Sequence, residues 1–280
     1  MSPGLGLRHQ RVQRLRRLLA RRSVRRAEGV FVVEGPSVLA AALAAGAEVE
    51  GVYLAPGAPE RVQVLAEQAA AGGARVFELA PGVLERVADT VTPQPVLAVV
   101  RQPRPSWASL GRASLAVVLA GARDPGNAGT VVRNAAAAGA DLVVFGEESV
   151  DPFNPKTVRA SAGAVLVVPV LCGPALEALA GLRAGGTRVL AAVARGGQPH
   201  TEVDLARPVA LVLGNEAAGL DPAVAGACDE QVSVPMPGAV ESLNLASAAA
   251  VLLFEAVRQR SNLPDVPRAG EGSKGPGGRW

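Results

Sequence analysis

The chain has 280 residues, of which 49% are hydrophobic and 19% charged, so it can build a buried core and is not disordered as a whole. At roughly 150 residues per domain, this length predicts two domains. The only cysteines are Cys172 and Cys228, and the only histidines are His9 and His200, which argues against a disulfide framework and a Cys/His metal site. Neither a run of about 18 apolar residues nor a signal peptide is visible. We therefore expect a cytoplasmic protein that does not span a membrane.

Basic charge is concentrated at the N-terminus. Residues 1–27 contain nine arginines and no acidic residue, although the whole chain has a net charge of only +3. Apolar residues fall at helical spacing between these arginines, which predicts an amphipathic basic helix over residues 1–28. Like charges without counter-charges repel one another unless an anionic partner binds, so we favour nucleic acid over a solvated face or a membrane surface. The candidate nucleic-acid contacts are Arg8, Arg11, Arg14, Arg21, Arg22 and Arg25.

Residues 29–101 alternate short strands with helical stretches, which predicts a small α/β domain. Pro103 and Pro105 mark residues 102–113 as a linker. The expected strands are Gly29–Glu34, Gly51–Leu54, Arg75–Leu79 and Val96–Arg101, and the expected helices are Ser37–Ala45, Glu60–Ala71 and Pro81–Ala88.

Residues 114–261 predict a second, larger α/β domain. Most of its strands are continuous apolar runs, as is typical of a parallel sheet covered on both faces. Residues 262–280 are rich in Gly, Pro and charge, so we expect a disordered tail. The predicted strands are Ser114–Ala120, Asp141–Phe145, Ala164–Val170, Arg188–Val193, Pro208–Leu213 and Gln231–Val234, and the predicted helices are Gly129–Ala138, Pro155–Ala160, Pro174–Ala184 and Ser242–Gln259.

The loop after the first strand of the second domain is rich in glycine. Gly121, Gly126 and Gly129 do not have the G-x-G-x-x-G spacing of a dinucleotide-binding turn, so a nucleotide-dependent oxidoreductase is disfavoured. Asn127 suits a helix N-cap, which is its structural interpretation. Arg133 follows in a helix of otherwise small apolar residues. A surface position is its structural interpretation, but a lone arginine among Ala and Val suggests that it points into a cleft.

Two later loops also follow predicted strands. Gly214, directly after Leu213, allows another group to approach the backbone closely. Glu216 carries a carboxylate that suits either chemistry or the capping of the next helix. Ser242 is a natural N-cap for the long apolar helix, and Asn244 is costly to bury there unless it is hydrogen-bonded. Taken singly, each loop is a weak indication of function.

Together, the three loops resemble a known family. The patterns N-x-G-x-x-x-R from Asn127, G-N-E-x-x-G-L from Gly214 and P-M-x-G-x-x-E-S-L-N from Pro235 occur in that order. This combination is similar to the SpoU (TrmH) family of RNA 2′-O-ribose methyltransferases. The likeness covers the whole second domain, including Arg159, which we assign to RNA contact. The first domain resembles the family's substrate-binding module, an α/β domain akin to small ribosomal proteins.

The resemblance implies a C-terminal parallel-sheet domain with a trefoil knot, of the SPOUT superfamily. It also implies a homodimer through the closing helix Ser242–Gln259, an RNA partner with 23S ribosomal RNA favoured, and S-adenosylmethionine as the cofactor. An adenine needs an apolar slot with a few backbone donors and acceptors, as a glycine turn and an apolar strand end provide. The implied cofactor-binding residues are Leu213, Gly214, Val234, Met236 and Leu243.

The implied reaction is attack of a ribose 2′-hydroxyl on the sulfonium methyl group. The family's proposed base matches Arg133, but arginine stays protonated in proteins. Two roles therefore remain open: Arg133 accepts the proton with help from a phosphate, or it stabilises the developing alkoxide as a fixed cation. Asn127, Glu216, Ser242 and Asn244 are expected to orient Arg133, the ribose and the donor.

Several alternatives follow from the same residues. Within the class, the substrate is alternatively a transfer RNA, or a ribosomal RNA methylated for antibiotic resistance. A more distant alternative is a non-catalytic RNA-binding protein, against which the intact set of Arg133, Glu216, Ser242 and Asn244 argues.

Overall fold

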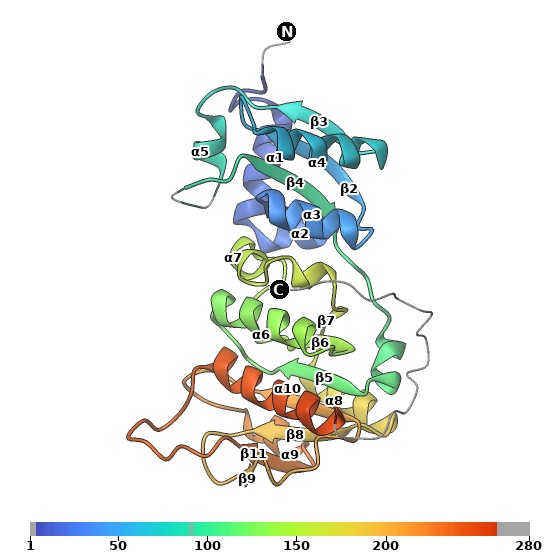
Figure 1. The fold of residues 1–280 in the computed structure, drawn as a ribbon, viewed down its shortest axis with the longest axis vertical. Helices are drawn as coiled ribbons and strands as arrows, with labels where there is room; N and C mark the ends of the chain where they lie inside the picture. The colour runs from blue at the N-terminus through green and yellow to red at the C-terminus, as the bar shows by residue number, and fades with distance from the viewer. Residues whose placement is uncertain (1–3, 89, 91, 262–280) are drawn as a thin grey trace.

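The computed structural model describes residues 4–88, 90 and 92–261 and contains two β-sheets, which follow one another along the long axis of the molecule (Figure 1). We call residues 4–101 the N-terminal module and residues 114–261 the C-terminal module. Both mix helices with strands, so the predicted α/β class is confirmed. The predicted tail, residues 262–280, lies outside the described residues. In the part of the chain that is described, no helix combines the length and apolar character needed to cross a membrane.

The N-terminal module is built on a four-stranded sheet of order β1-β4-β2-β3. Strand β4 pairs antiparallel with β1 and β2, whereas β2 and β3 are parallel. All four strands lie within two residues of their predicted bounds. The elements are β1 (Val30–Glu34), α3 (Pro36–Ala44), β2 (Val49–Leu54), α4 (Glu60–Ala71), β3 (Arg75–Glu78), α5 (Val83–Val87) and β4 (Val96–Arg101).

The basic N-terminal segment is two helices, so the prediction of one continuous helix is wrong. Helix α1 (Gln10–Ala20) and helix α2 (Arg22–Glu28) are separated by Arg21, whose backbone is extended with φ −124° and ψ 114°. Of the apolar residues at helical spacing, Val12, Leu15 and Leu18 are fully buried, and Leu19 is partly buried. Helix α1 therefore belongs to the core of the N-terminal module, and only its polar face meets solvent.

The C-terminal module contains a seven-stranded sheet of order β7-β6-β5-β10-β8-β11-β9. Every pairing is parallel, and all residues of the central strands β5 and β10 are buried, as expected for a sheet covered on both faces. Helices α6 and α10 pack on one face and α8 on the other. The elements are η1 (Trp107–Arg112, in the linker), β5 (Leu115–Leu119), α6 (Pro125–Ala137), β6 (Leu142–Phe145), α7 (Pro155–Ala160), η2 (Ala164–Leu166), β7 (Val170–Cys172), α8 (Ala175–Ala184), β8 (Arg188–Ala192), β9 (Gln198–Pro199), β10 (Val209–Leu213), α9 (Pro222–Gly226), β11 (Glu230–Ser233) and α10 (Leu245–Ser261).

The predicted strand Ala164–Val170 is wrong over most of its length. Its residues form the short 3-10 helix η2, and strand β7 begins only at the last of them. The backbone enters this segment in the left-handed conformation, with φ 50° at Ala162 and φ 89° at Gly163. Val165 and Val168 are buried all the same. A short apolar run indicates burial, but it does not distinguish a strand from a buried turn. The trefoil knot stays a prediction.

Candidate active site

A cavity of about 490 Å³ lies at the carboxyl edge of the C-terminal sheet. Because β5, β8, β10 and β11 are parallel, the loops that follow them meet at this edge, which is where open α/β sheets bind ligands. The structure thus brings together residues from all three loops singled out in the sequence. The cavity is lined by the predicted cofactor-binding residues Leu213, Gly214, Val234, Met236 and Leu243, and by Asn127, Glu216, Ser242 and Asn244.

Gly214 lies beneath a turn that folds back on it. The Asn215 N–H donates to the Gly219 carbonyl at 2.7 Å, and the Gly219 N–H donates to the Asn215 carbonyl at 2.9 Å. A Cβ on Gly214 would lie 2.4 Å from the Gly219 carbonyl carbon and oxygen and 2.6 Å from the Leu220 nitrogen. The position therefore requires glycine for a steric reason, and the turn forms one wall of the cavity.

Glu216 holds the entrance of helix α6 by its carboxylate. It accepts hydrogen bonds from the backbone N–H groups of Arg123 at 3.2 Å and Asp124 at 3.3 Å, and from the Asn127 side-chain amide at 3.3 Å. Burial raises the pKa of the Glu216 carboxyl. Hydrogen bonds from its own N–H and from Arg123, Asn127 and Asp124 lower the pKa by more, so the net shift is downward. Glu216 is therefore an anion at neutral pH. It does not cap the following helix, as one interpretation had it.

Two helix caps differ from the structural interpretations of the sequence. Helix α6 is capped by Asp124, whose carboxylate accepts from the Asn127 N–H at 2.6 Å, so Asn127 is not the N-cap. The side chain of Asn244 accepts from the Ala246 N–H at 2.9 Å and caps helix α10. Ser242 lies before that helix, is exposed, and is free for another role at the cavity. These caps leave the amide of Asn127 available to the site.

The side chains of the three loops form one hydrogen-bonded row. The Asn244 amide donates to the Asn127 carbonyl oxygen at 2.9 Å, and the Asn127 amide donates to the Glu216 carboxylate. Each amide is thereby fixed in one orientation, because its donor and its acceptor both have a partner. The row presents an anion and two oriented amides at the rim of an apolar cavity, which can orient a hydroxyl group and a bound ligand.

Arg133 lies on helix α6 outside this row. Its side chain is exposed, and it is not among the residues that line the cavity in the described part of the chain. It lies six residues after Asn127, or about 9 Å along the helix axis. The structure therefore gives Arg133 the surface position of its structural interpretation, and not the cleft that the sequence suggested. The chemical role predicted for Arg133 stays a prediction.

One residue that shapes the site was not singled out from the sequence. The side-chain oxygen of Asn215 accepts from the N–H groups of Ala217 and Ala218 at 3.0 and 2.9 Å, and its amide donates to the Gly121 carbonyl at 3.0 Å. Asn215 thus forms the turn and ties it to the first loop. The signal was an Asn directly after a glycine at a strand end, which is typical of an Asx turn.

Comparisons with known proteins agree with this geometry. The profile of the SpoU rRNA Methylase family matches residues 114–254, and that of the MRM3-like substrate binding domain matches residues 9–98. The 23S rRNA (uridine(2479)-2′-O)-methyltransferase of Streptomyces viridochromogenes is 32% identical over 265 residues, which are 90% of this chain and 91% of the relative. The chain belongs to the SpoU rRNA methylase family.

Further members of the SpoU family resemble the chain closely. The 23S rRNA (guanosine(2553)-2′-O)-methyltransferase RlmP of Bacillus subtilis is 36% identical over 182 residues, 65% of this chain and 72% of the relative. The crystal structure of an AdoMet-bound rRNA methyltransferase from Sinorhizobium meliloti has a TM-score of 0.80 at 31% identity, and covers 91% of this chain and 96% of that chain. The likeness thus extends over both modules.

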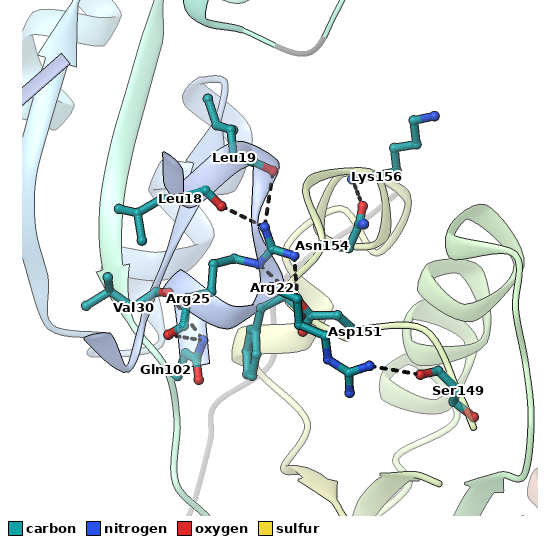
Figure 2. A network of polar contacts seen from close by, with 11 residues as sticks. Leu18, Leu19, Arg22, Arg25, Val30, Gln102, Ser149, Asp151, Asn154 and Lys156 are labelled. Atoms are coloured by element: carbon teal, nitrogen blue, oxygen red, sulfur yellow. Dashed lines mark hydrogen bonds and ion pairs between the residues drawn. The ribbon is translucent and has the colours of Figure 1, made fainter. Parts of the chain in front are cut away.

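The N-terminal arginines of this SpoU protein do not all face solvent. Arg25 is only 3% exposed, and its guanidinium forms an ion pair with Asp151 at 2.6 Å (Figure 2). Its assignment as an RNA contact is therefore wrong, because a buried, paired guanidinium cannot reach a phosphate. Arg14 is half-buried and pairs with Glu28 at 2.6 Å and Glu50 at 2.9 Å.

The other candidate RNA contacts differ in how many contacts their side chains make within the protein. Arg11 lies over the Phe77 ring at 4.5 Å from its centroid, and Arg22 donates to the Ser149 carbonyl at 3.5 Å. Arg159 lies 3.5 Å from the Glu34 carboxylate. The expectation that this segment lacks counter-charges overlooked acidic residues from elsewhere in the chain. Within residues 4–28, the exposed arginines for which the described part of the chain shows no ion pair, ring contact or side-chain hydrogen bond are Arg8, Arg16, Arg17, Arg21 and Arg26.

Proposed function

We propose that this protein transfers the methyl group of S-adenosylmethionine to a ribose 2′-hydroxyl in RNA, with 23S ribosomal RNA as the favoured substrate. The observation that carries the proposal is the convergence of three loops on one cavity in a chain of the SpoU family. Two of the relatives reported above are named as 23S rRNA 2′-O-methyltransferases. Methylation of a transfer RNA remains the second candidate, because one relative is named a tRNA/rRNA methyltransferase.

The cavity suits the methyl donor in size and lining. Its volume of about 490 Å³ lies within the range of small-molecule sites, and its walls combine apolar side chains with the backbone of the Gly214 turn. Leu213, Gly214, Val234, Met236 and Leu243 would hold the donor. When bound, S-adenosylmethionine supplies an electrophilic methyl group on a positively charged sulfur. Glu216, an anion at neutral pH, lines the same cavity and would add a fixed negative charge to the donor site.

The residues of the chain supply orientation and charge for the attacking hydroxyl. The row of Asn244, Asn127 and Glu216 holds the three loops in one arrangement, so a ribose bound at the rim meets pre-oriented groups. Ser242, exposed at the cavity, is free to donate to or accept from the substrate. Arg133 either accepts the hydroxyl proton or stabilises the developing alkoxide, and its constant charge favours the second role.

The direct test is transfer of a radiolabelled methyl group from S-adenosylmethionine to RNA by the purified protein. Mapping of 2′-O-methyl positions in RNA from cells with and without the gene then identifies the nucleotide. Labelling of 23S rRNA at a ribose supports the proposal, and labelling of transfer RNA would shift it to the second candidate. RNA binding without any binding of the donor, measured by calorimetry, would instead indicate a non-catalytic RNA-binding protein.

Binding of RNA is expected to depend on the exposed arginines of α1 and α2. Deleting residues 1–27 is not a clean test, because Val12, Leu15 and Leu18 belong to the core. In the double variant Arg8→Gln/Arg21→Gln, loss of two phosphate contacts lowers the slope of log affinity against log salt by about 1.4 to 1.8. Filter binding at several salt concentrations measures this. The variant Arg183→Gln/Arg207→Gln removes the same charge from the C-terminal module, and an equal effect there would contradict a specific role for α1 and α2.

Helix α10 also supports a homodimer, which we include in the proposal. One face of α10 packs inside the module through Ala249, Leu252 and Leu253, whereas Phe254 is 48% exposed. Phe254→Asp places a charge where the α10 of a second chain would pack. We therefore expect light scattering to give the mass of a dimer for the wild type and of a monomer for this variant. Val64 on α4 is similarly exposed at 44%, and Val64→Asp should leave the mass unchanged. If the Phe254→Asp variant is still a dimer, the exposed face of α10 is not the dimer interface.

A further inference from the structure

Arg25 stands apart from the other N-terminal arginines because all three of its guanidinium nitrogens have partners inside the protein. Nε and Nη2 both donate to one Asp151 carboxylate oxygen, at 2.8 and 2.6 Å. Nη1 donates to the carbonyls of Leu18 at 2.6 Å and Leu19 at 3.1 Å, in the last turn of α1 (Figure 2). A cation at this end of a helix is favourable. Arg25 thus connects both N-terminal helices to the C-terminal module.

Asp151 belongs to the segment between β6 and α7, and its second carboxylate oxygen accepts from the Phe153 N–H at 3.0 Å. The ring of Phe153 packs on Phe31 of strand β1, with centroids 4.8 Å apart. At another point of the boundary between the modules, a Cβ on Gly163 would lie 2.8 Å from the Ala41 side chain of α3. The two modules are therefore packed directly against each other around the ion pair, and are not simply joined by the linker.

The same segment is hydrogen-bonded to the first loop of the active site. The Ser149 hydroxyl donates to the Leu119 carbonyl at 2.7 Å and accepts from the Gly121 N–H at 3.0 Å. The Val150 N–H donates to the Ala122 carbonyl at 2.9 Å. Gly121 in turn accepts from the Asn215 amide. The segment 149–151, which contains the partner of Arg25, is thus linked by hydrogen bonds to the loop before α6, and through Gly121 to the turn that carries Glu216.

We propose that Arg25 is a positioning residue, which with Asp151 fixes the RNA-binding N-terminal module in one orientation relative to the cavity. An RNA bound to the exposed arginines of α1 and α2 then lies at a fixed distance from the three loops. Its ribose reaches the cavity in one orientation, which a module moving freely on the linker would not ensure. The inference rests on the proposed function and adds to it that the substrate-binding module is clamped before RNA arrives.

The test removes the ion pair without leaving a buried charge alone. In Arg25→Gln/Asp151→Asn both partners are neutral and can still hydrogen-bond, whereas Arg25→Gln alone would strand the Asp151 carboxylate and destabilise the fold. Spin labels are placed at Val64→Cys on α4 and Leu176→Cys on α8, both exposed, in a Cys172→Ser/Cys228→Ser background. Labelled protein is diluted with unlabelled protein, so that the distances measured by pulsed electron resonance lie within one chain.

We expect the double variant to widen the distance distribution at least twofold and to lower kcat for RNA methylation about tenfold or more. The dissociation constants for S-adenosylmethionine and RNA should stay within about threefold of wild type, because the cavity and the exposed arginines are unchanged. The matched control is Arg26→Gln on the same helix, which is exposed; it should weaken RNA binding without widening the distribution.

Three results would overturn the inference. They are a distribution as narrow as in wild type, a wider distribution with unchanged kcat, or weaker RNA binding with a reduced salt slope in the double variant, which would make Arg25 an RNA contact. If the double variant fails to fold, Arg25→Lys, which keeps a charge beside Asp151 but replaces three donating nitrogens by one, is measured in the same way. If the protein does not methylate RNA at all, the proposed function fails in wild type too, while the distance distributions still test the clamp.

Discussion

Replacing Arg133 with alanine is expected to lower the rate of methyl transfer by about 100-fold or more, which corresponds to about 2.7 kcal/mol of transition-state stabilisation. The physical reason is the loss of the permanent cation that, under the proposed function, stabilises the developing alkoxide of a ribose bound beside the exposed side of helix α6. The protein should stay folded, because the Arg133 side chain is exposed and alanine is the best helix former. Single-turnover transfer measures the rate, and the circular dichroism spectrum and melting temperature serve as controls.

Arg133→Lys separates the two chemical roles left open for this residue. A lysine in its place titrates near pH 10, so the rate between pH 7 and pH 10 reports which protonation state is active. If the side chain stabilises a developing alkoxide, the rate of the variant falls as pH rises, because the cation is lost. If it accepts the proton, the rate rises with pH, because only the neutral amine is a base. A folded Arg133→Ala variant with near-normal transfer would remove this residue from the mechanism.

The layered fold could be predicted because the strand sequences are continuous apolar runs, which indicate that both faces of the sheet are buried. The five residues of β5 and the five of β10 are all apolar and all buried, and such runs separated by helical stretches leave few alternatives to a parallel sheet. The same logic failed in the run that begins at Ala164, where Val165 and Leu166 are buried in a 3-10 turn and Val167 is exposed. Apolar character predicts where a residue lies, but the backbone conformation there depends on the preceding left-handed residues.

Most residues that line the cavity could be predicted from the sequence, but the position of Arg133 outside it and the contacts of the site could not. The motifs identified the residues that line the cavity, because each motif ends a strand and parallel strands end together. The partners were not visible: the Glu216 carboxylate binds groups 92 and 93 residues away in the sequence. Likewise, nothing near Arg25 distinguishes it from Arg26, since its burial depends on Asp151 in the other module. Local charge patterns therefore overestimate how many arginines are available to RNA.

Replacing Gly214 with alanine is expected to abolish measurable binding of S-adenosylmethionine, with an affinity loss of about 100-fold or more, equivalent to about 2.7 kcal/mol. The added methyl group would meet backbone atoms of Gly219 and Leu220 at 2.4 to 2.6 Å, and backbone cannot rotate away as a flexible side chain can. The turn must therefore move as a unit. That movement displaces Asn215 and with it the Glu216 carboxylate, so the wall and the rim of the cavity change together.

Stability should suffer less than binding in this variant. Overpacking of this kind costs about 1 to 3 kcal/mol, which a folded domain of this size tolerates when its central strands are intact. Gly226→Ala is the matched control, because a Cβ there meets no atom within 4 Å and the backbone is helical. Calorimetric titration with S-adenosylmethionine should give a wild-type affinity for Gly226→Ala and none for Gly214→Ala. Equal affinities in the two variants would show that the donor does not bind against the Gly214 turn. The backbone at the end of β10 would then be excluded as its binding site.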